Sequence, residues 1–309
     1  MNDFTLLKVI KVGNLLGECI LWDDLGQCTW WTDIHNAMLY RYRPADATLE
    51  HFVLPERLCS FGFIENDERL ICAFASGIAL YSPVTGQREW LYRPELAYSG
   101  TRFNDGRVDR QGRFWSGTMV EGATATDADQ REVLGSLYWV SATSHGKTLG
   151  AIRISNSLCW SPDAKTVYFA DSPGKTINAY DFDTATAAFT NPRPFAVTSA
   201  GSAPDGSIID AQGCLWNAQW GGSSVVRYSP SGEILARLEL PVSQPTCMCL
   251  GGPELNWLFV STAREGLDAV QLAAQQEAGN VFVYQTPFKG LRENRFQRNH
   301  GSISTGDRL

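Results

Sequence analysis

Four stretches of the sequence place polar side chains where an apolar strand would begin. Glu18 opens GECILW, Asn156 lies in ISNSLCWS and Asp205 lies in SAPDGSIID. The fourth stretch, RFNDGRVD, carries Arg102, Asn104 and Asp105. Carboxylate and amide oxygens unaccompanied by sulfur or imidazole suit Ca²⁺, Mg²⁺ or Mn²⁺ better than a structural zinc ion. Two carboxylates and one amide carbonyl would also leave open positions for water and a substrate oxygen, as a catalytic metal site requires.

Each of these residues also has an ordinary structural interpretation. Asn104-Asp105-Gly106 and Asp205-Gly206 are sequences that commonly form turns. Glu18 taken alone is no more informative. What favours a functional site is that these residues recur at one position of a repeat.

Other catalytic motifs are missing from the sequence. There is no GxSxG, no GxGxxG and no complete phosphate-binding loop, since the PGKT at 173–176 lacks the required preceding glycine. None of the histidines has a partner at metal-ligand spacing, which excludes zincin-type and multi-histidine zinc sites. Oxygen-ligand metal chemistry is what remains. The histidines are His35, His51, His145 and His300.

The elements that must position these residues form a repeat. Its unit is a strand, an acidic or Asn/Gly turn, an aromatic-rich strand, a short polar turn and a third strand. Six copies follow one another roughly 40 to 50 residues apart, which is the spacing of stacked or radial repeats. The central strand of each copy contains one large side chain at the same position: Trp30, Ile71, Trp115, Tyr168, Trp216 and Phe259.

This repeat predicts an all-β protein, a single six-bladed β-propeller, because six sheets with two apolar faces each can bury both by packing around an axis. A pair of β-sandwich domains is the alternative, but no linker or shift in composition divides the chain. The polar residues described above would open the innermost strands and converge on the central channel. Residues 1–296 are expected to form the propeller, and 297–309 a polar tail, either disordered or left over from expression.

Two insertions interrupt the repeat, at 120–140 and 262–280, each after a central strand. Insertions on one face of a repeat protein usually build a binding face. Trp115 and Trp216 are interpreted as blade core, because they occupy the repeated central position. Trp220, in NAQWGG, is the better candidate for a wall of the site.

Composition narrows the class of protein further. The 309 residues are 44% hydrophobic with a net charge of -7, which argues against disorder and against nucleic acid as a partner. The first twenty residues do not resemble a signal peptide, and no apolar run is long enough to cross a bilayer. We therefore expect a cytoplasmic protein without membrane contact, a monomer or weak homo-oligomer, with its eight cysteines buried as free thiols.

Several of these stretches together resemble the senescence marker protein 30/regucalcin/gluconolactonase family. The resemblance rests on GE before a strand, RFNDGRVDRQGRFWSGTMVE, ISNSLCWSPD, DSPGKTINAYDFD, PDGSIIDAQGCLW and REGLD…EAGNVF. It covers about 17–290, nearly the whole propeller. It implies a six-bladed propeller and a divalent-metal-dependent sugar lactonase. The implied cofactor is one divalent ion, Ca²⁺, Zn²⁺, Mg²⁺ or Mn²⁺.

The resemblance also implies a role for each candidate. The metal ligands would be Glu18, Asn156 and Asp205, and Asp205 would also be the catalytic acid/base. The substrate contacts would be Arg102, Asn104 and Glu121. The sequence departs from the family pattern in ISNSLCWS, where Ser157 and Cys159 replace the usual glycine and an acidic or small residue, and in SAPDG. These departures leave the ligands in place and bear on substrate preference.

The expected reaction is hydrolysis of a sugar lactone, such as gluconolactone or a pentonolactone, to the free aldonic acid. It needs a polarised carbonyl, an activated water and a proton for the leaving hydroxyl. Two alternatives stay open: a non-catalytic calcium-binding or regulatory propeller, and a metal-dependent esterase or phosphotriesterase of the same fold.

Overall fold

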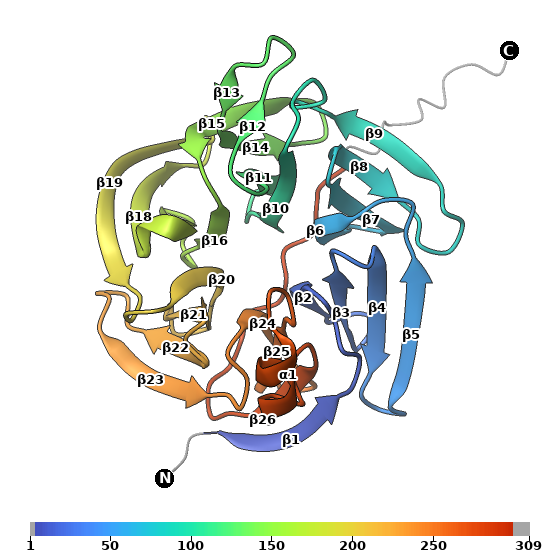
Figure 1. Ribbon diagram of the computed structural model, residues 1–309, viewed down its shortest axis with the longest axis vertical. Coiled ribbons are helices and arrows are strands. Elements are labelled where there is room, and N and C mark those ends of the chain that lie inside the picture. The colour runs from blue at the N-terminus through green and yellow to red at the C-terminus, as the bar shows by residue number, and fades with distance from the viewer. Residues whose placement is uncertain (1–3, 299–309) are drawn as a thin grey trace, which may run out of the picture.

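The computed structural model describes residues 4–298 as six four-stranded antiparallel sheets arranged around a central axis (Figure 1). This confirms the six-bladed propeller. The six residues predicted to mark central strands all lie in the second strand from the axis. Within these residues no helix is long and apolar enough to cross a membrane.

The strands of each blade follow one another from the axis outward. Blade 1 is β2 (Gly17–Asp23), β3 (Cys28–Asp33), β4 (Met38–Arg43) and β5 (Thr48–Val53); blade 2 is β6 (Leu58–Ile64), β7 (Asp67–Phe74), β8 (Gly77–Tyr81) and β9 (Arg88–Tyr92). Blade 3 is β10 (Thr101–Val108), β11 (Phe114–Val120), β14 (Gly135–Val140) and β15 (His145–Ile152); blade 4 is β16 (Ser155–Trp160), β17 (Thr166–Asp171), β18 (Thr176–Asp183) and β19 (Ala188–Val197). Blade 5 is β20 (Ala203–Ile209), β21 (Leu215–Trp220), β22 (Ser224–Tyr228) and β23 (Ile234–Glu239); blade 6 is β24 (Pro245–Gly251), β25 (Trp257–Thr262), β26 (Val281–Gln285) and β1 (Thr5–Ile10).

Blade 6 combines the two ends of the chain. Its outermost strand is β1, which pairs antiparallel with β26 from Thr5↔Gln285 to Ile10↔Val281. The isolated bridge Leu16↔Ala263 adds a second link between the start of blade 1 and the end of β25. The ring is therefore closed by backbone hydrogen bonds between its first and last segments. The sequence analysis did not identify the strand β1.

Both insertions leave the second strand of a blade, at the face where the innermost strands begin. The first forms the hairpin β12 (Ala125–Thr126) and β13 (Glu132–Val133), tied back by the bridge Ser99↔Thr126. The second contains α1 (Ala269–Ala274), which begins with a capping box between Asp268 and Gln271. A 3₁₀ turn, η1 (Ser172–Gly174), follows β17. The same-face arrangement predicted for the insertions is what the structure shows.

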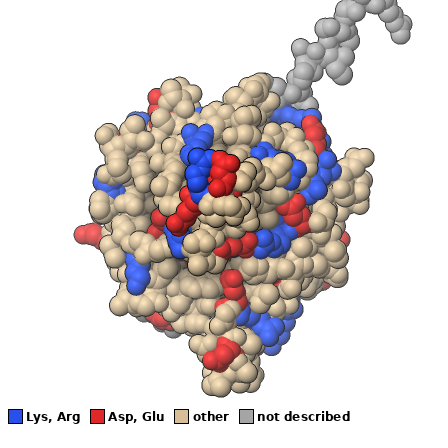
Figure 2. Space-filling model, turned by 45° about the horizontal axis from the view of Figure 1, so that its top comes forward, with Lys and Arg blue, Asp and Glu red and all other residues tan. Residues whose placement is uncertain are grey.

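The blade cores confirm the structural interpretation of the large aromatic residues. Trp115 and Trp216 are fully buried, and the indole N–H of each donates to an aspartate six residues earlier, Asp109 at 2.8 Å and Asp210 at 3.0 Å. All eight cysteines are free and buried, as predicted. On the face drawn in Figure 2, acidic and basic side chains are interspersed in small groups among uncharged residues.

The chain after β26 crosses the opposite end of the channel. There Glu293 forms an ion pair with Arg107 at 2.8 Å, and the buried Phe296 pairs with Ile64 in β6. The described chain ends with Gln297, whose backbone N–H donates to Gly112, and Arg298. The rest of the predicted tail, 299–309, lies outside the described residues.

Candidate functional site

A cavity of about 290 Å³ opens where the innermost strands begin. It brings together Glu18 of β2, Arg102 and Asn104 of β10, Asn156 of β16 and Asp205 of β20. Five of the six predicted site residues therefore meet at one place, although they come from four blades. The other lining residues, largely apolar, are Leu16, Met119, Ile154, Ser172, Ala203, Pro204, Trp220 and Glu265.

Irregular backbone in the innermost strands directs these side chains. The pairing register shifts directly after Glu18 in β2 and directly after Asn156 in β16. The next residues, Cys19 and Ser157, have left-handed backbone angles, φ 47° and 61°. A β-bulge re-aims the neighbouring side chain, so these bulges turn the carboxylate and the amide toward the channel. The turn interpretation of the Asp-Gly pairs is wrong, because they lie inside β10 and β20.

Ser157 shows how this chain tolerates a residue other than glycine at a left-handed position. Its hydroxyl donates to the backbone carbonyl of Asp205 at 2.7 Å and accepts from the Asn217 amide at 3.1 Å. Both bonds are buried, and they offset the cost of about 1–2 kcal/mol for a side chain in this conformation. The departure from the family pattern thus links β16 directly to the backbone of Asp205.

A chain of hydrogen bonds orients the two amides and Arg102. The Arg102 guanidinium donates to the Asn104 side-chain oxygen at 2.6 Å, and the Asn104 nitrogen donates to the Asn156 oxygen at 3.1 Å. The Asn156 nitrogen donates in turn to the Ser172 hydroxyl at 2.9 Å. These bonds fix the orientation of the Asn156 amide, whose oxygen accepts one hydrogen bond and retains a second lone pair.

Both carboxyl groups have raised pKa values. Burial, followed by repulsion from the nearby Asp105 carboxylate, raises the pKa of Glu18 from 4.5 to about 8. Burial and repulsion from Glu18 raise the pKa of Asp205 well above its usual value. The Glu18 carboxylate accepts one backbone N–H, from Cys19 at 3.2 Å, whereas the Asp205 carboxylate accepts no hydrogen bond from residues 4–298.

These oxygens fit a divalent cation. Two buried carboxylates that repel each other, one of them without a hydrogen-bond donor, face one cavity together with an amide oxygen. Arg102, the one Lys or Arg side chain among the lining residues, is already bonded to Asn104, Phe103 and Glu121. No group of three or more His, Cys, Asp or Glu side chains placed for a metal occurs in the described part of the chain, so a cation bound here would need an oxygen of another kind, such as that of the Asn156 amide.

Glu121, the sixth predicted residue, is not among the residues that line the cavity. It lies beside it at the end of β11, where its two oxygens accept from Arg57 at 2.7 and 2.9 Å and one also accepts from Arg102 at 3.1 Å. The hydrogen bonds from Arg57 lower the pKa of Glu121. Glu121 therefore holds Arg102 in place in this structure, and Arg57 completes the cluster.

The sequence analysis missed Glu265, which lines the cavity from the second insertion and pairs with His35 at 2.8 Å. Its position after the sixth central strand was the available signal, because the insertion was expected to build the binding face. Trp220 lines the cavity, as predicted.

Comparison with known proteins identifies a matching family. The family model described as SMP-30/Gluconolactonase/LRE-like region matches residues 16–264. The chain is 38% identical to an L-arabinolactonase of Azospirillum brasilense over 92% of each chain. It is 34% identical to a 6-deoxy-6-sulfogluconolactonase of Pseudomonas putida over 96% of this chain and 99% of the other.

A solved structure is similar over the whole propeller. It is described as a calcium-binding protein, regucalcin, from Agrobacterium tumefaciens, and superposes with a TM-score of 0.85 at 30% identity. The match covers 94% of this chain and 97% of that one.

Proposed function

The chain belongs to the SMP-30/gluconolactonase/LRE-like family, and from this premise we propose that it hydrolyses a sugar lactone with the help of one divalent metal ion. The observation that carries the proposal is the convergence of Glu18, Asn156 and Asp205 with Arg102 and Asn104 on one cavity. The relatives named as lactonases act on cyclic esters of sugars. A small neutral lactone is of a size that this cavity can take.

Glu18, Asn156 and Asp205 would hold the ion through oxygen atoms. When bound, a divalent ion supplies Lewis-acid polarisation of the lactone carbonyl. Arg102 and Asn104 would orient the substrate from the neighbouring blade, since both side chains are fixed by the hydrogen bonds described above. Glu121 would take part by holding Arg102 and by accepting a substrate hydroxyl on a remaining lone pair.

Asp205 would carry the proton. As water attacks the carbonyl carbon, the Asp205 carboxylate takes a proton from that water. As the bond between the carbonyl carbon and the ring oxygen breaks, the same carboxyl returns the proton to the departing ring oxygen. The products are the carboxylic acid and the freed hydroxyl. Burial raises the pKa of Asp205, which suits a group that must take up a proton and release it again.

The test is acid release from a panel of aldonolactones by wild-type protein and by Asp205→Asn. The proposal expects turnover of at least one lactone by wild type and a loss of about 10³-fold or more in kcat in the variant. Turnover of no lactone by metal-supplied wild type would overturn it.

A second candidate function is a calcium-binding propeller without catalytic activity, favoured by the description of the Agrobacterium structure as calcium-binding. It would need the three oxygen ligands but not Arg102. Calcium binding without turnover of any lactone would support this function over the first.

A further inference from the structure

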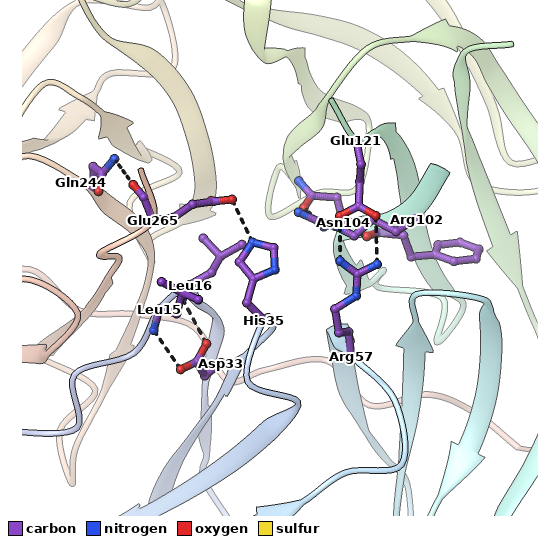
Figure 3. Close-up of polar contacts among 11 residues, drawn as sticks. Leu15, Leu16, Asp33, His35, Arg57, Arg102, Asn104, Glu121, Gln244 and Glu265 are labelled. Carbon is purple, nitrogen blue, oxygen red and sulfur yellow. Dashed lines mark hydrogen bonds and ion pairs between the residues drawn. The ribbon is translucent and has the colours of Figure 1, made fainter. Parts of the chain in front are cut away.

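We propose that Glu265, held by His35, forms a hydroxyl-binding subsite for the sugar ring on the wall of the cavity opposite Arg102 and Asn104. The inference rests on the proposed lactonase function and assigns it a further specificity-determining residue. Figure 3 shows the His35–Glu265 pair on one side of the opening and the group of Arg57, Glu121 and Arg102 on the other. A sugar ring bound between them would contact polar side chains on both sides.

One carboxylate oxygen of Glu265 is available to a ligand. Oε1 accepts from His35 Nε2 at 2.8 Å, whereas Oε2 has no partner among residues 4–298. The side chain is 43% exposed and lines the cavity. The hydrogen bond from His35 lowers the pKa of Glu265, so the group is a carboxylate at neutral pH. An ionised carboxylate with a free oxygen is a strong acceptor for a hydroxyl group.

The backbone fixes this carboxylate in position. The Glu265 N–H donates to the Leu15 carbonyl at 3.0 Å, and the Glu265 carbonyl accepts from the Gln244 side chain at 3.0 Å. Leu15 and Leu16 donate their own N–H groups to the carboxylate of Asp33, at 2.9 and 3.0 Å.

Asp33 ends β3 two residues before His35. One anchoring carboxylate therefore organises both the segment that binds the Glu265 backbone and the turn that carries His35. A subsite whose parts are held before the ligand arrives loses little entropy on binding.

Glu121, which lies behind Arg102 on the other side of the cavity, differs in this respect. Arg57 and Arg102 together donate three hydrogen bonds to its two oxygens, whereas Glu265 accepts one. Glu265 is thus the carboxylate with the greater capacity for a substrate hydroxyl. Because it adds a negative charge to the wall near Glu18 and Asp205, it favours a neutral hydroxylated lactone over one with an anionic substituent on that side.

The experiment compares aldonolactones with their monodeoxy analogues, using wild type and Glu265→Ala. For wild type we expect one monodeoxy analogue to lose about tenfold to a hundredfold in kcat/KM, the size of one hydrogen bond to a charged group. Glu265→Ala should show a similar loss on the parent lactone, mainly in KM, and almost none on that analogue. His35→Ala should give a smaller loss with the same dependence on the analogue.

Two controls separate this role from a structural one. Glu277→Gln alters an ion-paired carboxylate in the same insertion that is not among the residues lining the cavity, and should leave kcat/KM unchanged. Metal titrated by calorimetry should bind wild type and Glu265→Ala alike. An equal loss by Glu265→Ala on the parent and on every monodeoxy analogue, or no loss on any lactone, would overturn the subsite.

Failure of the subsite proposal can be distinguished from failure of the proposed lactonase function. If wild type hydrolyses no lactone, the lactonase proposal fails and the subsite is judged by calorimetric binding of the same lactones. Binding that weakens in Glu265→Ala for the parent but not for one monodeoxy analogue supports it. Binding unchanged by the substitution, or absent in wild type, refutes it.

Discussion

At the scale of single residues, the fold buries the carboxyl groups of Glu18 and Asp205 at the site where we propose that a cation binds. Burial raises the pKa of each carboxyl group, and repulsion from Glu18 raises that of Asp205 further. Removing one should therefore lower the proton affinity of its neighbour as well as the affinity for a cation. Arg102 lies at the same cavity and lowers the pKa of both groups, but burial has the larger effect on each, so substitution of Arg102 should disturb this balance less than removal of either carboxylate.

This difference predicts distinct effects of two substitutions. Asp205→Ala should abolish turnover and weaken metal binding, because it removes both a ligand charge and the proposed proton carrier. Arg102→Ala should bind metal almost as wild type does and lose about 10–150-fold in kcat/KM, as expected for one charge-assisted contact. Metal calorimetry beside lactone kinetics measures both. Loss of the metal in Arg102→Ala would show that the roles are assigned wrongly.

The raised pKa values predict how the stability of the metal-free protein depends on pH. Between pH 4.5 and about 8 the Glu18 carboxyl is ionised in the unfolded chain but still protonated in the folded one. The folded state then binds more protons, so stability falls as pH rises through this window, and Asp205 adds to the same trend. Thermal unfolding in EDTA from pH 5 to 9 measures it.

A divalent ion should reverse this dependence, since it replaces the protons and binds best when both carboxylates are ionised. The gain in Tm on adding Ca²⁺ or Mn²⁺ should therefore be larger at pH 9 than at pH 5. Glu18→Gln is the control, and should flatten the slope in EDTA. A Tm in EDTA that rises across the window would contradict the electrostatic account.

At the scale of elements, a turn-and-tryptophan unit recurs in blades 3 and 5. The Asp109 carboxylate accepts the backbone N–H of Gln111 and Arg113, the Arg113 side chain and the Trp115 indole. Asp210 accepts the indole of Trp216 in the same way. One buried carboxylate thus holds both the turn and the core aromatic residue of the blade.

Asp109→Ala should destabilise the protein by about 3–5 kcal/mol, because it leaves the Arg113 charge and the indole N–H without a partner. Metal affinity should not change, since Asp109 does not line the cavity. Asp129→Ala, an exposed position in the first insertion, is the matched control. Urea unfolding measures the difference, and a change below about 1 kcal/mol would show that the unit does not stabilise the blade.

The elements also explain what the sequence could predict. The repeat of apolar strands specifies the blades, and polar residues that interrupt it at one position must point into the channel, so Glu18, Asn156 and Asp205 could be identified. Glu265 could be assigned only to an insertion on the binding face, and its pairing with His35 could not be predicted, because both lie in irregular segments whose contacts depend on the closed ring. The strand Thr5–Ile10 was missed because it pairs with residues about 270 positions away and is largely exposed.

At the scale of the whole molecule, closure of the ring positions the site. Blade 6 takes its outer strand from the N-terminus, and the bridge Leu16↔Ala263 lies next to Glu18 and Glu265 in sequence. Deleting residues 1–10 should lower Tm by several degrees and speed amide exchange in β26, whose outer edge would be exposed. Exchange in β26 as slow as in the full chain would contradict this role of β1.

We propose that three oxygen ligands from three blades make this protein a metal-dependent lactonase. The most direct measurement is the rate of acid release from the best lactone before exhaustive chelation, after it, and after a divalent ion is restored, with Asp205→Ala treated in parallel. Chelation should abolish turnover, more than one hard or borderline cation should restore it, and no cation should restore the variant. Full turnover by the chelated wild-type protein would contradict it.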